Sequence, residues 1–186
     1  MPQHVIEWQR EHADFVRLLQ LLEAQVQLFQ GGQRPDYDLM LDVMHYMTRY
    51  ADRFHHARED LAFQRLARHQ PAVTAIAAAL NHQHAEMAAD GAGLVAELRA
   101  VMQGAMLPRQ AVASQACAYA ACLRRHIERE ERELYPLLAH LRQEDWFMID
   151  SMIHCVDFGN ESERVYRALH QQIAQAAGCG CDSGGG

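Results

Sequence analysis

The stretch FHHAREDLAF, residues 54–63, places two adjacent histidines one helical turn before two carboxylates. His55 precedes Glu59 by four residues, and His56 precedes Asp60 by the same spacing. Side chains four residues apart lie on one face of a helix, so either pair can hold a metal ion or form a solvated charge pair. The other residues on the two faces distinguish these interpretations.

The two pairs are predicted to lie in different environments. Steps of three and four from His55 reach an apolar stripe, which contains Met44, Met47, Ala51, Ala62 and Leu66. The same steps from His56 reach a charged face, which contains Arg49, Asp52, Arg53 and Asp60. We therefore expect His55 and Glu59 to point into a core, and His56 and Asp60 to be solvated.

Breaker residues divide the chain around this stretch into long segments with helical periodicity. They are Gly31-Gly32 with Pro35, then Pro71, then Gly104 with Pro108. Between them apolar residues recur at helical spacing, without the alternation of a strand. The predicted helices span about residues 3–30, 36–68, 72–103 and 109–141, and Pro136 should end or kink the last one. Four long helices with short connections predict an all-α protein, an antiparallel up-down-up-down four-helix bundle.

The sequence after the bundle predicts a small helical extension. We expect residues 1–142 to form the bundle domain and residues 143–176 to add two short helices, near 143–156 and 160–176. The apolar residues of the first either cover one end of the bundle or make a homodimer contact; they are Trp146, Phe147, Met148, Ile149 and Met152. Residues 177–186 are predicted to be a disordered tail. Its Cys179 and Cys181 either ligate a soft metal, form a redox pair or have no specific role.

The composition argues against several classes of partner. The 186 residues carry a net charge of −7, which gives no basic surface for nucleic acid. No apolar run approaches the roughly 18 residues that a membrane span requires. The start, MPQHVIEW, lacks the pattern of a signal peptide, and the cysteine count is odd, at five. These features predict a cytoplasmic protein with reduced thiols.

Histidine is unusually abundant, with 12 residues, and the bundle geometry selects four of them. In an antiparallel bundle the starts of the first and third helices lie level with the ends of the second and fourth. At a rise of about 1.5 Å per residue, one histidine from each helix falls in a slab roughly 10 Å deep, together with two carboxylates. These six donors, which also lie on apolar stripes, are His12, His55, Glu59, His84, His126 and Glu130.

Four histidines and two carboxylates in an apolar core are costly unless they bind metal or one another. Two carboxylates can bridge two ions, with two histidines capping each ion, and coordination positions remain for water, oxide or a diatomic ligand. Nitrogen and oxygen donors without thiolate favour iron, with manganese or zinc as alternatives. The other interpretation is a metal-free network of His/Glu pairs in an interaction or scaffold module.

These residues resemble the hemerythrin-like family, the HHE cation-binding domain, in its bacterial six-ligand branch. The resemblance covers about Ile6 to Leu141 and rests on REH (10–12), RFHHAREDLAF (53–63), NHQHAEM (81–87) and RHIEREERELYPLL (125–138). It implies a non-haem di-iron centre in a four-helix bundle, with the same six residues as ligands. Oxygen-carrying hemerythrins place two histidines four apart on the third helix, where this chain has Leu80 and Ala88 around His84.

The resemblance also implies a function. We expect a protein that binds or senses O2, NO or a peroxide in oxidative or nitrosative stress or in iron homeostasis, without a dedicated organic substrate. The alternative is a di-iron enzyme, namely a peroxidase, an oxidase or an NO reductase, that uses the same site.

Three residues beyond the ligands are candidates for tuning the site. Tyr119, two turns before His126, either donates a hydrogen bond to a bound oxygen species or is a core aromatic. Cys122 is expected to be a small core residue. Glu23 lies some 16 Å further along the stripe of His12, and it either forms part of a proton or ion route or reaches the surface.

Overall fold

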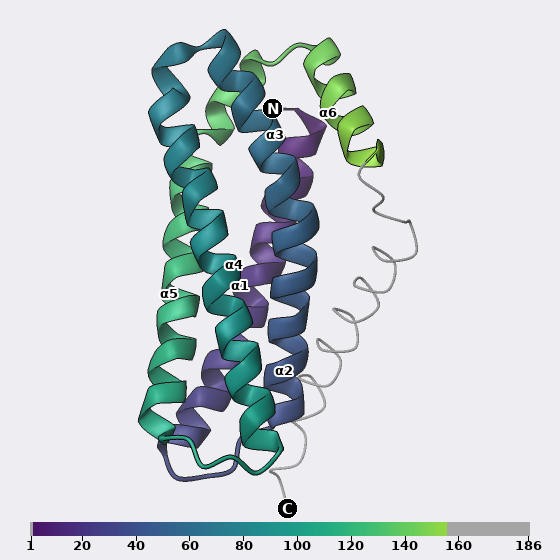
Figure 1. Ribbon diagram of the computed structural model, residues 1–186. Helices are drawn as coiled ribbons and strands as arrows, with labels where there is room; N and C mark the ends of the chain where they lie inside the picture. The colour runs from purple at the N-terminus through teal and green to yellow at the C-terminus, as the bar shows by residue number, and fades with distance from the viewer. Residues whose placement is uncertain (1, 156–186) are drawn as a thin grey trace, which may run out of the picture.

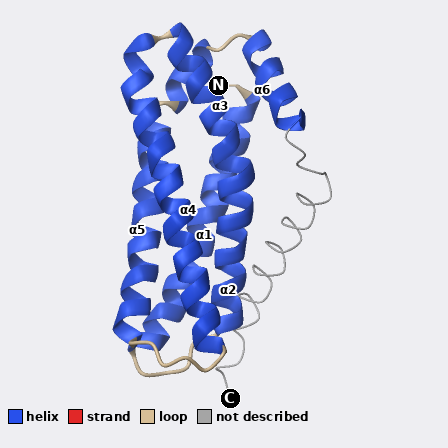
Figure 2. Cartoon of the chain, viewed as in Figure 1, coloured by secondary structure: helices blue, strands red, loops and turns tan. Residues whose placement is uncertain are grey.

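A computed structural model describes residues 2–155 of the protein (Figure 1). All regular structure in this part of the chain is helical, as Figure 2 shows, and the prediction of an all-α protein is confirmed. None of the described helices is long and apolar enough to cross a membrane. The predicted helix at 160–176 and the tail at 177–186 lie outside the described residues.

The long helices form columns that run side by side (Figure 1). The first column is α1 (Gln3–Gln30), and the second is a continuous run of α2 (Tyr37–Tyr46), the π-helical segment η1 (Met47–His55) and α3 (His56–His69). A π-helical turn contains more residues than an α-helical turn. Residues on either side of η1 therefore do not follow one α-helical periodicity.

The second half of the chain supplies the other two columns and a short extension. After the 3-10 turn η2 (Pro71–Val73), α4 (Thr74–Met102) forms the third column, and α5 (Arg109–Glu133) forms the fourth. The 3-10 segment η3 (Tyr135–His140) then leads to α6 (Gln143–Cys155). Helix α1 contacts α2 and α5, and α4 contacts α2, α3 and α5, so each column packs against two others.

Cap and turn residues set the ends of the columns. Asp36 caps α2 by accepting a hydrogen bond from the backbone N–H of Leu39 at 3.0 Å. Gly32 (φ 79°) and Gly104 (φ 91°) adopt left-handed conformations after α1 and α4, where a side chain would be strained. Helix α5 ends shortly before Pro136, whose ring cannot continue an α-helix.

The core consists of two apolar clusters with a polar layer between them. One cluster includes Trp8 of α1 and lies toward α6, and the other includes Phe15 of α1 and extends to the opposite end. His12 lies between these two residues on the same helix, and it is buried although it is polar. The helices therefore place a layer of ionisable side chains in the middle of an apolar interior.

Helix α6 packs against α3 near one end of the bundle. Trp146 and Asp145 are buried, and Asp145 Oδ1 accepts hydrogen bonds from Arg65 Nε at 2.5 Å and from His69 Nε2 at 3.0 Å. The opposite face is apolar and exposed, with Phe147 71% accessible. One face of α6 thus packs against α3, and its opposite face is exposed to solvent. The homodimer contact stays a prediction.

Candidate metal centre

His55 and Glu59 project from the second column into the interior. His55 is the last residue of η1, and Glu59 lies in the first turn of α3. His55 Nε2 lies 3.2 Å from Glu59 Oε1, and both side chains are fully buried. The pair therefore faces the core, on the side of the helix that the apolar stripe indicates.

The other three columns add donors at the same level. His12 Nε2 lies 3.4 Å from Glu59 Oε1 and 3.5 Å from Glu130 Oε2. Across the interior, His84 Nε2 lies 2.8 Å from His126 Nε2. Glu130 Oε1 lies 3.2 Å from the first of these nitrogens and 3.0 Å from the second. The structure thus brings the six predicted donors together, and all of them are buried.

The six donors fit metal ions better than they fit a closed hydrogen-bond network. Glu59 Oε2, Glu130 Oε2 and His55 Nε2 are buried without a hydrogen-bond partner among the described residues. Each unsatisfied buried polar atom costs about 1–3 kcal/mol, a cost that coordination to a metal ion removes. Nitrogen and carboxylate oxygen donors without thiolate suit iron, and also manganese or zinc. The donor set therefore supports a metal centre of this class.

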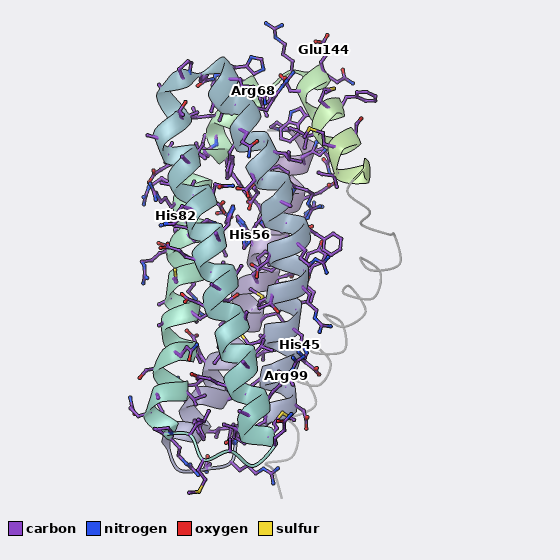
Figure 3. The ribbon with its side chains drawn as sticks, viewed as in Figure 1. His45, His56, Arg68, His82, Arg99 and Glu144 are labelled. Atoms are coloured by element: carbon purple, nitrogen blue, oxygen red, sulfur yellow. The ribbon has the colours of Figure 1, made fainter. Side chains whose placement is uncertain are left out.

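The prediction that His56 is solvated is wrong. Its side chain is buried, and its ring stacks on that of His84 with centroids 4.2 Å apart and planes 9° apart. Figure 3 shows His56 between the helices, whereas His82 points outward. The prediction counted α-helical steps through residues 47–55, where the structure has the π-helical η1, and the extra residue per turn changes which face His56 occupies. The prediction that Asp60 is solvated also differs from the structure, because its side chain is only partly exposed and contacts His84.

An outer layer of acceptors orients the four predicted imidazoles. Each Nδ1 lies close to an oxygen of a second residue, in the pairs His12–Glu131 (3.0 Å), His55–Glu11 (2.5 Å), His84–Asp60 (2.9 Å) and His126–Gln83 (3.2 Å). When Nδ1–H donates outward, Nε2 is left with its lone pair toward the centre, as a metal ligand requires. None of these acceptors was predicted, because the register between neighbouring helices decides which of them reaches a ring.

Tyr135 is a further residue that the sequence did not reveal. Its hydroxyl donates a hydrogen bond to Glu59 Oε1 and lies 3.2 Å from His12 Nε2. Its ring stacks against that of His12 with centroids 5.3 Å apart. Burial and the charges of Glu59 and Glu130 raise the pKa of the Tyr135 hydroxyl well above its ordinary value. A protonated phenol therefore stands beside the carboxylates, at the point where the chain turns before Pro136.

The carboxylates alter the protonation of the imidazoles. Burial lowers the pKa of His12, but hydrogen bonds to Glu131 and Glu59 and the charges of Glu59 and Glu130 outweigh it and raise the pKa to about 10. The pKa of His84 also rises to about 10, because its carboxylate neighbours outweigh the effect of burial. Without a metal ion these two rings carry protons at neutral pH.

Uptake of a metal ion by these donors is therefore expected to weaken as the pH falls. A ligand must be deprotonated, so an ion must displace the protons on His12 and His84. Since both pKa values lie near 10, this competition operates throughout the neutral range and strengthens toward acid. Per proton displaced, the apparent affinity should fall up to about tenfold per pH unit. Competition with a chromophoric chelator between about pH 8 and pH 6 measures this; an affinity independent of pH, after correction for the chelator, would contradict it.

The structure places two of the three tuning candidates in or against an apolar cluster and the third in an ion pair. Tyr119 is buried in the apolar cluster that extends away from α6, where its ring lies beside Gly91. Cys122 packs partly buried against the same cluster. Glu23 forms a partly exposed ion pair with Arg124, whose Nη2 lies 2.8 Å from Glu23 Oε2. This pairing favours the surface interpretation of Glu23 over a proton or ion route.

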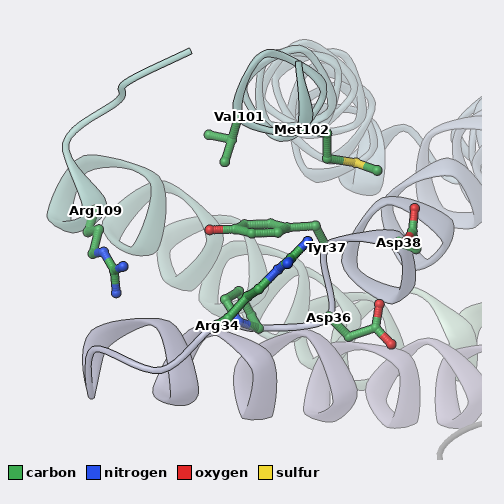
Figure 4. A pocket seen from close by; sticks show the side chains of 8 residues that line it. Arg34, Asp36, Tyr37, Asp38, Val101, Met102 and Arg109 are labelled. Atoms are coloured by element: carbon green, nitrogen blue, oxygen red, sulfur yellow. The ribbon is translucent and has the colours of Figure 1, made fainter. Parts of the chain in front are cut away.

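A surface hollow of about 580 Å³ lies at the end of the bundle opposite α6, where α1 connects to α2 (Figure 4). Its lining includes Arg34, Tyr37 and Arg109, with Val101 and Met102 from the end of α4. None of the six donors lines this hollow. We therefore assign it no part in the metal chemistry.

One of the comparisons with known proteins identifies a family for this chain. The family profile described as the hemerythrin HHE cation binding domain matches residues 4–138, a range that contains all six donors. Neither the curated proteins nor the solved structures gave a match. The match covers more than half of the chain and carries a cation-binding description that the buried histidines and carboxylates fit. The chain therefore belongs to the hemerythrin HHE cation-binding domain family.

Proposed function

We propose that this protein holds two iron ions in its polar layer and binds or senses a small ligand, either O2, NO or a peroxide. The ions lie in an antiparallel up-down-up-down four-helix bundle formed by residues 1–142. The physiological setting that family membership suggests is oxidative or nitrosative stress or iron homeostasis. When bound, the iron would supply the position at which the small ligand attaches.

The position of the two carboxylates carries the proposal. Glu59 Oε1 lies 3.2 Å from His55 Nε2, while its Oε2 lies 3.8 Å from His84 Nε2. Glu130 has the converse arrangement, with Oε1 3.0 Å from His126 Nε2 and Oε2 3.5 Å from His12 Nε2. Each carboxylate thus directs one oxygen to each histidine pair. Such a donor set suits two adjacent ions that share both carboxylates.

Tyr135 would serve as a hydrogen-bond donor beside this centre. Its raised pKa keeps the hydroxyl protonated, and its present acceptor is Glu59 Oε1. A bound ion would draw negative charge from Glu59, so the hold of this carboxylate on the phenol would weaken. The hydroxyl would then be able to donate to a small ligand at the edge of the centre.

Optical titration of the iron-loaded chain tests ligand binding. Addition of NO to an anaerobic sample, and exposure of separate samples to O2 or to peroxide, should change the near-ultraviolet and visible absorption. The change should be absent in Glu130→Ala and retained in Glu86→Ala, whose glutamate is exposed and also follows a histidine by four residues. No spectral response to O2, NO or peroxide would contradict the ligand-binding part of the proposal. Repeated turnover of peroxide or NO would instead indicate the enzyme alternative.

A further inference from the structure

His56 forms part of the polar layer although it was not among the predicted ligands. Its ring centroid lies 4.2 Å from that of His84 and 5.7 Å from that of His126. A ring nitrogen of each of these three histidines lies within 4.8 Å of the other two, and all three side chains are buried. This spacing is compatible with coordination of one ion by all three rings.

The outer side of His56 matches the pattern of the predicted ligands. Its Nδ1 lies 3.2 Å from Oδ1 of Asp52, and both atoms are buried without a hydrogen-bond partner among the described residues. The four predicted imidazoles likewise present Nδ1 to an oxygen of a second residue. Such an acceptor fixes the tautomer and the ring orientation of a ligating histidine. With Nδ1 directed to Asp52, the remaining donor atom of His56 is Nε2.

The π-helical segment explains how two adjacent histidines can both face the interior. In an α-helix successive residues point about 100° apart, so one member of a doublet normally turns away from a narrow core stripe. Here η1 ends at His55, and His56 begins α3. Both side chains are buried, and their ring centroids lie 5.6 Å apart. π-Helical turns of this kind are frequent at functional sites.

We infer that His56 is a fifth imidazole ligand of the centre, on the same ion as His84 and His126. The inference rests on the proposed iron-binding function and makes the two ions unequal. One ion receives three imidazoles, and the other receives only His12 and His55, with both carboxylates shared. The ion with fewer protein donors lies on the side of the Tyr135 hydroxyl, which is 3.2 Å from His12 Nε2.

The test combines iron content with Mössbauer spectroscopy of the full chain loaded anaerobically with ferrous 57Fe. The wild type should show two unequal quadrupole doublets, one for each ion. His56→Ala should alter the doublet of the three-imidazole ion and weaken binding of that ion at least about tenfold, a loss already typical when a residue behind a ligand is removed. Added imidazole should restore the original doublet, since it can occupy the space of the missing ring, whereas a purely structural role would not respond in this way.

His82→Ala is the matched control, because His82 is exposed and pairs with Glu86 four residues later. His56→Gln serves as a second variant that retains a hydrogen-bond donor toward Asp52, and circular dichroism verifies that each variant is folded. The inference is overturned if either folded His56 variant keeps the iron content and both doublets of the wild type, as His82→Ala should. A wild-type chain that takes up no iron would overturn the proposed function as well, so the two failures are distinguishable.

Discussion

Glu59→Ala is expected to reduce the iron content from about two ions per chain to less than one. Glu59 is one of the two carboxylates that lie between the histidine pairs, because its oxygens approach His55 on one side and His84 on the other. In the proposed centre its loss would remove a ligand from both ions and leave their charges less neutralised. Elemental analysis after anaerobic loading and desalting measures the effect. Loss of a residue that only hydrogen-bonds to a metal ligand typically lowers the affinity for the metal 10–100-fold. Loss of a ligand itself should cost more, so the affinity for each ion should fall by at least about 100-fold.

Glu86→Ala is the matched control for this experiment. Glu86 also follows a histidine by four residues, but its side chain is 60% accessible and its pair with His82 is open to solvent. Its iron content should equal that of the wild type. If Glu59→Ala folds and retains the wild-type content, shared coordination by the carboxylates is wrong.

Removal of the metal is expected to lower the melting temperature substantially. An ion that binds only the folded chain stabilises it by RT ln(1 + [L]/Kd), which is about 2.7 kcal/mol when the free ion is at 100 times Kd. For a chain of this length that corresponds to roughly 5–10 °C. Calorimetry of the chain as loaded, after treatment with a chelator, and after reloading measures the shift. Reloading should restore the original melting temperature.

The same experiment addresses the interaction or scaffold interpretation. A bundle that merely tolerates paired histidines and carboxylates gains nothing from iron, so chelation would leave its melting temperature unchanged. His82→Ala should behave as the wild type in every state, because its ring is on the outer surface. An unchanged melting temperature in the wild type would favour the scaffold over the metal centre.

Much of the fold could be predicted because its signals are local. Gly32 and Gly104 adopt the left-handed conformation that ends a helix, and Pro136 follows the end of α5. The apolar stripes in between have helical period, so α1 and α4 were predicted to within about two residues of their observed ends. The interruption of the second column by η1 could not be predicted, because no cap, glycine or proline marks a π-helix.

The height of a side chain along the bundle, and the face of the helix from which it projects, could be predicted only where the helix is regular. His12, His84 and His126 lie on uninterrupted α-helices, and the structure places them where these criteria indicate. His56 follows η1, so a count of α-helical steps assigned it to the wrong face. Tyr135 could not be found in this way either, because it fell within the helix predicted at 109–141, whereas the structure ends α5 at Glu133 and places Tyr135 in the 3-10 segment η3.

The acceptors behind the imidazoles depend on contacts between helices. Glu11 and Glu131 have no distinctive spacing in the sequence, and they reach His55 and His12 only because α1 packs against the second column and against α5. Burial raises the pKa of Glu11, but hydrogen bonds and charges from His55 and Arg58 outweigh it and lower the pKa to about 2. Glu11 therefore stays ionised and can hold the His55 ring in place at any neutral pH.

The central claim is that the buried donors hold two iron ions, and the iron content of the wild-type chain tests it most directly. Purified protein is loaded anaerobically with ferrous iron, freed of unbound metal, and measured by elemental analysis together with its electronic spectrum. The account predicts about two iron ions per folded chain, and absorption bands that appear on oxidation. Folded protein that remains colourless and free of iron after this treatment would contradict it.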